Sequence, residues 1–128
     1  MRHARSLPFK LASAAVALCL GAALAGCSHT VGLGSERVLR LALTEYRIHP
    51  DRVRVQAGEL TIVVRNVGLL THNLTISRGD QAQAQTTPIP PGSRRQLTVI
   101  LTPGTYYLDS SLFSDRALGL YGTLVVTG

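Results

Sequence analysis

The feature that most constrains this chain is the alternation of apolar and polar residues in short runs after Arg37. In the run 52–56, Arg-Val-Arg-Val-Gln, both valines fall on one face, as an antiparallel sheet with one wet face requires. No window after Arg37 has the period of an amphipathic helix. We therefore expect an all-β sandwich with an aliphatic core, built from strands at 37–46, 52–57, 60–67, 72–78, 94–101, 105–110 and 121–127.

One long stretch between these predicted strands has no clear pattern. Residues 79–92, GDQAQAQTTPIPPG, are polar at first and then rich in proline. We expect this segment to cross between the sheets or to cover a sheet edge, and a short helix within it is possible.

The first 26 residues have the three parts of a bacterial lipoprotein signal peptide. A basic start, MRHARSLPFK, precedes an apolar run, LASAAVALCLGAA, and the box LAGC follows at 24–27. Only sixteen uncharged residues, 11–26, are available, whereas a spanning helix needs about twenty. We therefore predict a signal peptide helix at 1–26 and a lipid bearing palmitate on Cys27.

The small and polar residues 27–36 are then expected to form a lipidated, flexible tether to a single domain, 37–128. This arrangement places the domain outside the cytoplasm, anchored to the cell membrane within the bacterial envelope. Because Cys19 would leave with the signal peptide, the processed chain has no cysteine pair for an internal disulfide.

The charge of the chain argues against a nucleic-acid partner. The formal net charge is +6, but Arg2, Arg5 and Lys10 belong to the predicted signal peptide. The arginines after it are dispersed, whereas nucleic-acid binding requires a basic stripe interleaved with aromatic residues. The expected partners are the membrane, through Cys27, and a protein of the envelope.

Four segments, in this order, resemble the cupredoxin family: YRIHPDRVRVQAG (46–58), NVGLLTHNLTI (66–76), PGSRRQLTVILTPGTYYL (91–108) and GLYGTLVV (119–126). They cover most of 37–128. In that family the second segment carries the first copper-ligating histidine, the third leads into the loop that supplies the other ligands, and the fourth follows that loop. The resemblance implies a Greek-key β-sandwich of seven or eight strands.

The resemblance also implies which residues occupy the copper-ligand positions. His72 matches the first histidine, and the family's spacing of Cys, His and Met falls on Ser110, Asp115 and Leu120. A blue-copper site needs two imidazoles, a thiolate and a weak axial thioether. After the tether there is no cysteine or methionine, so we expect a degenerate site without a resident cofactor, at which copper would bind weakly.

The three replacements suggest how such a site is filled. Leu120 is nearly isosteric with methionine, and the Ser110 hydroxyl can hydrogen-bond locally. We expect Asp115 to accept a charge-assisted hydrogen bond from His72. His72 is then either a structural residue or a weak metal ligand supported by Asp115. His49 is a further candidate ligand, but we interpret it as a solvated turn residue.

Two functions remain open. The first is a membrane-anchored, non-enzymatic module that meets an envelope protein or ligand through its 110–121 loop, where apolar residues are expected to form a surface: Leu112, Phe113, Leu118, Leu120 and Tyr121. For Leu118 and Leu120, burial between the sheets is an equal alternative. The alternative is copper handling by a partial site at His72. Ser110 or Ser111 with His72 and Asp115 makes a nominal hydrolytic triad, but no nucleophile elbow accompanies it, so we do not expect an enzyme.

Overall fold

The computed structural model describes Leu33 and residues 37–128. These residues form β1 (Val38–Thr44), β2 (Arg47–His49), β3 (Arg52–Gln56), β4 (Gly58–Asn66), β5 (Thr75–Arg78), β6 (Gln81–Gln85), β7 (Arg94–Leu101), β8 (Gly104–Asp109), the single helical turn α1 (Asp115–Leu118) and β9 (Tyr121–Thr127). The predicted signal peptide, Cys27 and all of the tether except Leu33 lie outside the described residues.

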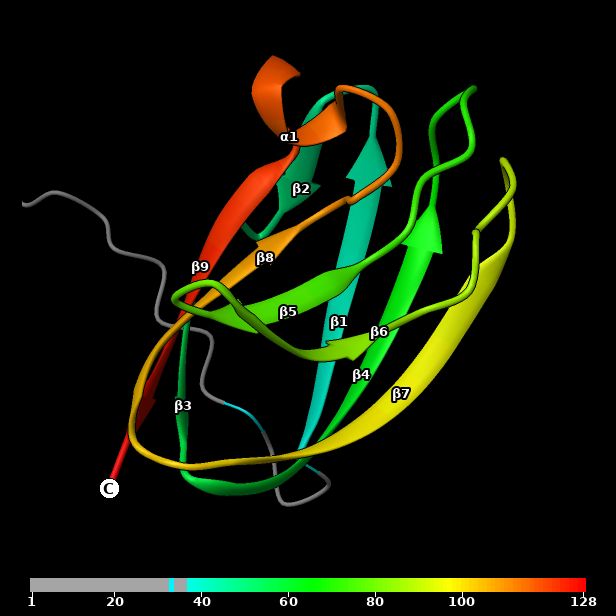
Figure 1. Cartoon of the computed structure of the whole chain (residues 1–128). Coiled ribbons are helices and arrows are strands. Elements are labelled where there is room, and N and C mark those ends of the chain that lie inside the picture. Colours follow the sequence, from blue (N-terminus) through cyan, green and yellow to red (C-terminus); the bar gives the residue numbers. More distant parts are fainter. Residues whose placement is uncertain (1–32, 34–36) are drawn as a thin grey trace, which may run out of the picture.

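The strands build two sheets that face each other (Figure 1). One sheet has the order β2-β1-β4-β7, and the other has the order β3-β9-β8-β5-β6. The β1–β4 and β3–β9 pairs are parallel, and the remaining neighbours are antiparallel. Because the chain changes sheet between β2 and β3 and four more times by the time it enters β8, the predicted Greek-key sandwich is confirmed.

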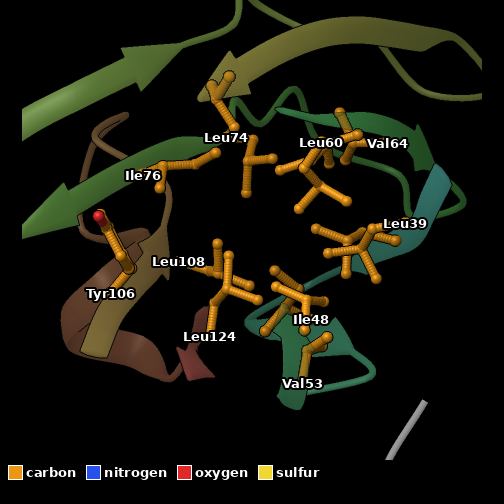
Figure 2. Packing of buried hydrophobic residues seen from close by; sticks show 14 of the residues in the cluster. Leu39, Ile48, Val53, Leu60, Val64, Leu74, Ile76, Tyr106, Leu108 and Leu124 are labelled. Carbon is orange, nitrogen blue, oxygen red and sulfur yellow. The ribbon is translucent and has the colours of Figure 1, made fainter. Parts of the chain in front are cut away.

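The core between the sheets is almost entirely aliphatic, as the sequence predicts. Inward-facing residues from both sheets meet there, and Leu39, Leu60, Leu108 and Leu124 have no exposed surface (Figure 2). Alternation positions these side chains, since β3 buries Val53 and Val55 and exposes the polar residues between them. Leu33, from the segment expected to be a tether, packs against the same core.

The number of strands was predicted incorrectly, because β2 and β6 were missed. The predicted strand 37–46 ends at Thr44, since Tyr46 adopts a left-handed φ of 61° and turns the chain into β2. Residues 79–92 are not wholly irregular and contain no helix, because β6 lies within them and pairs with β5. A mostly exposed edge strand needs backbone pairing on one side only, so β6 carries no apolar alternation.

The domain has two distinct ends. At one end, Arg37 donates hydrogen bonds to the carbonyls of Gln56 and Glu59 around the turn between β3 and β4. At the other end lie the loops that follow β4 and β8, together with α1 (Figure 1). Across the described residues there is no apolar helix of membrane-spanning length.

Candidate functional site

His72 lies at the loop end of the sandwich and is completely buried. Its backbone makes an isolated antiparallel bridge with Ile89, so the predicted strand 72–78 begins only at Thr75. Asn66 reinforces this bridge, because its side-chain amide donates to the carbonyls of Ile89 (2.8 Å) and Leu70 (2.6 Å). The position of the imidazole is therefore set by backbone on two sides.

The structure brings together the residues predicted to replace the copper ligands. His72 Nδ1 lies 2.8 Å from Asp115 Oδ2, so the predicted contact between these residues is confirmed. Ser110 Oγ lies 2.6 Å from the same carboxylate oxygen. Because an ionised carboxylate can only accept, the imidazole and the hydroxyl are both donors to Asp115.

Asn73 extends this cluster and was not singled out from the sequence. Its backbone N–H donates to Ser110 Oγ, and its side-chain carbonyl accepts from the Ser111 N–H at 2.8 Å. Its amide group donates to Ser111 Oγ at 2.9 Å. The start of the 110–121 loop is thus hydrogen-bonded to the residue next to His72. In the sequence, the only indication of this role of Asn73 is that it directly follows His72.

Glu45 approaches His72 from the other side and was also missed. Its Oε1 lies 3.8 Å from His72 Nε2, which is buried and has no hydrogen-bond partner among the described residues. The same oxygen accepts the backbone N–H groups of Leu69 (2.5 Å) and Leu70 (2.9 Å). These two donors hold the pKa of Glu45 below its ordinary value and fix the loop after β4.

The other candidate residues have different outcomes. Leu120 is fully buried, so of the two placements left open for it, the loop surface and the interior of the sandwich, the structure supports the interior. The reason is that Leu120 directly precedes β9 and its N–H bonds the Asp115 carbonyl at 2.9 Å, which turns the residue inward. His49 is exposed on β2, as expected of a solvated residue, and it is not part of the His72 cluster.

The donor set does not fit a blue-copper centre. Ser110 offers a neutral hydroxyl and Leu120 offers only hydrocarbon, where the centre requires a thiolate and a thioether. Asp115 supplies a hard oxygen, and His72 Nδ1 is already engaged with it. In the region from Arg37 to Gly128, no three His, Cys, Asp or Glu side chains are grouped so as to hold a metal ion.

The cluster is also not arranged for nucleophilic catalysis. A serine nucleophile transfers its proton to an imidazole, which a carboxylate orients from behind. Here Ser110 Oγ is hydrogen-bonded to Asp115 and to Asn73, and the carboxylate stands between the hydroxyl and the imidazole. The connectivity is therefore that of a structural network.

Comparisons with known proteins agree with this architecture. No family model matches the sequence, and no curated protein matches it. An auracyanin from the photosynthetic bacterium Roseiflexus castenholzii superposes with a TM-score of 0.66 over 74% of this chain and 100% of its own, at 18% identity. Auracyanin A of Chloroflexus aurantiacus, a "blue" copper protein, superposes with a TM-score of 0.62 over 70% of this chain and 98% of its own, at 16% identity. A purple cupredoxin from Nitrosopumilus maritimus superposes with a TM-score of 0.56 over 70% of this chain and 99% of its own, at 17% identity.

This chain has a cupredoxin-like fold. Within the fold, the loops after β4 and β8 both reach the His72 cluster and both expose large apolar side chains. The most exposed are Phe113 (95%) and Leu69 (84%). We call the following residues the loop face: Val67, Leu69, Leu70, Phe113 and Leu118.

The Asp115 carboxylate is predicted to stabilise the cupredoxin-like domain by more than any other side chain of the 110–121 loop. Asp115→Ala leaves two buried donors, His72 Nδ1 and Ser110 Oγ, without their acceptor, and each such loss costs about 1–3 kcal/mol. Urea unfolding measures this cost. The matched control is Ser114→Ala, since the neighbouring Ser114 is exposed and makes no capping hydrogen bond, and it should change stability by less than about 0.5 kcal/mol. Equal stabilities for the two variants would contradict the prediction.

Proposed function

We propose that this chain is a lipid-anchored, extracytoplasmic binding module, without enzymatic activity and without a resident blue-copper centre. One observation carries the proposal. A buried carboxylate, Asp115, takes the place of a metal ion by satisfying both His72 Nδ1 and Ser110 Oγ. The cluster therefore has a stabilising role that needs no metal, and function is left to the surrounding surface.

The loop face supports binding to a partner protein. Single exposed apolar residues are ordinary on a protein surface, but here two loops at the same end of the sandwich each expose large ones. Glu45 fixes one loop through the N–H groups of Leu69 and Leu70, and Asp115 fixes the other. Loops held in place in this way lose little conformational entropy on binding, which favours a preformed docking surface.

The position of the chain's entry into the domain supports an anchor at Cys27. Arg37, which precedes β1, is bound at the turn between β3 and β4, and the loop face lies at the opposite end (Figure 1). Because Leu33 packs against the core, six residues, 27–32, separate it from the attachment point, and they span roughly 20 Å when extended. An anchored domain would therefore present its loop face away from the attachment point, toward a protein partner.

The anchor is tested by labelling with palmitate. We expect the wild-type protein to incorporate the label and to sediment with membranes, whereas Cys27→Ser should lose both properties, because Cys27 is the only thiol available to the processed chain. Cys19→Ser is the matched control and should remain labelled. Labelling of Cys27→Ser would refute the anchor.

Copper handling by a partial site is the second candidate function. It is favoured by one observation, that the buried His72 Nε2 has no hydrogen-bond partner among the described residues while Glu45 Oε1 is 3.8 Å away. An imidazole and a carboxylate are few ligands for copper, and Glu45 Oε1 already accepts the N–H groups of Leu69 and Leu70.

A copper titration separates the two functions. It uses the protein carrying Cys27→Ser, so that the anchor thiol does not bind the metal, with calorimetry and visible absorption as readouts. The binding module predicts no intense blue absorption and the same weak uptake in His72→Ala as in the parent. His49→Ala is the matched control, since His49 is exposed. Tight uptake that is lost only in His72→Ala would instead establish copper handling.

Docking through the loop face is tested by site-specific photo-crosslinking in intact cells. A photoreactive residue at position 113 should give a discrete protein adduct. The same residue at position 100 should not, because Ile100 is 79% exposed but lies on β7 at the end opposite the loop face. The substitution Leu69→Ser should reduce the adduct at position 113 severalfold, because exposed apolar anchors dominate such interfaces. Indistinguishable adducts from positions 113 and 100 would overturn the docking proposal.

A further inference from the structure

The outer face of the sheet formed by β5, β8 and β9 carries a hollow. It lies between the β5–β6 hairpin and the 110–121 loop, and its walls include Thr75, Ser77, Tyr107, Asp109, Phe113 and Tyr121. The hollow adjoins the His72 cluster, because Ser110 lines it and also donates a hydrogen bond to Asp115. Its lining combines two acids, Asp80 and Asp109, and one cation, Arg116, with three aromatic rings and several hydroxyl groups.

Asp109 forms the charged part of this hollow. It ends β8 and is only 5% exposed. Loss of hydration raises the pKa of its carboxyl above the ordinary value, and the nearby Arg116 partly opposes that rise. A carboxylate with so little water around it requires a cation to compensate its charge.

The chain provides one cation to Asp109, and the side chain of this cation is largely exposed to solvent. Arg116 Nη1 lies 3.0 Å from Asp109 Oδ2, yet the Arg116 side chain is 61% exposed and projects from the single turn α1. Its guanidinium carbon lies 5.9 Å from the ring centre of Tyr121, which stacks on Tyr107 at 5.9 Å. Arg116 thus demonstrates the two contacts that the hollow offers to a cation, an ion pair and a cation–π interaction.

A second observation indicates that Arg116 does not satisfy all the hydrogen-bonding groups of the hollow. Thr75 is the cross-strand neighbour of Asp109 in the register of β5 and β8. It also lines the hollow, and its Oγ1 is buried with no hydrogen-bond partner among the described residues. Buried hydroxyl groups are usually bonded, so an unpaired one beside a desolvated carboxylate suggests that a donor is missing.

We propose that this hollow binds an organic cation, a guanidinium or a primary ammonium group, which displaces Arg116 and takes its place between Asp109 and the stacked Tyr107 and Tyr121. The cation is either a free small molecule or an arginine or lysine side chain of a protein partner. The site does not depend on the proposed docking function, because a free cation can fill it without any partner. Arg116 acts as an internal competitor.

The test is an NMR titration of the protein carrying Cys27→Ser with the amide of N-acetylarginine. The amide of N-acetylcitrulline, which has the same shape without the charge, is the matched control. We expect the backbone amides of Tyr107, Asp109 and Tyr121 to shift with the arginine probe only. Asp109→Asn should weaken binding about thirtyfold or more, because it removes the buried partner of the charge.

Arg116→Ala distinguishes a binding site from a purely structural ion pair, because only in a binding site does its removal change the affinity for the probe. Removing the internal competitor should tighten binding of the arginine probe by up to about fivefold, since an exposed ion pair of this kind is weak. Arg47→Ala removes an exposed arginine from another strand and should have no effect. Equal binding of the arginine and citrulline probes, or unchanged affinity in both Asp109→Asn and Arg116→Ala, would overturn the proposal.

The source of the cation follows from combining this titration with crosslinking at position 113. If a partner side chain fills the hollow, Asp109→Asn should reduce the adduct as well as binding of the probe. If a free small molecule fills it, the adduct should be unaffected. A protein that binds the probe but gives no adduct retains the cation site and loses the docking function, so the two proposals fail separately.

Discussion

A single carboxylate oxygen holds the loop end of this domain together. Asp115 Oδ2 accepts from His72 Nδ1 and from Ser110 Oγ, and all three residues are buried. His72 is in turn bridged to Ile89. Three loops that are distant in sequence therefore depend on one acceptor. A buried anion is stable only where donors surround it, so this arrangement fixes its neighbours as strictly as a bound ion would.

The parts of the fold that depend on burial were predictable from the sequence. Strands such as β3 alternate because one face meets the core, so their side-chain directions follow from the order of residues alone. The meeting of His72 and Asp115 was also predictable, because the resemblance to cupredoxins implied that both residues occupy ligand positions of one site. The spacing that the resemblance suggested was sufficient to identify Ser110 as the third member.

The parts that depend on backbone contacts were not predictable. Glu45 acts on His72 only because the loop after β4 folds back and offers the N–H groups of Leu69 and Leu70 to the carboxylate. No pattern of side chains in the sequence predicts where such backbone donors lie. The same reason explains why β6 was missed, since its pairing with β5 is made by backbone.

Asp109 and Asp115 lie six positions apart, the first at the end of β8 and the second in the loop that follows, and both are buried, but their partners differ in kind. The donors to Asp115 are buried side chains that cannot leave without disrupting the core. The partner of Asp109 is an exposed arginine on the single turn α1, so its displacement, as proposed, would require no strand to move. Burial of the partner, more than burial of the acid, thus separates a residue that maintains the fold from one that is available for binding.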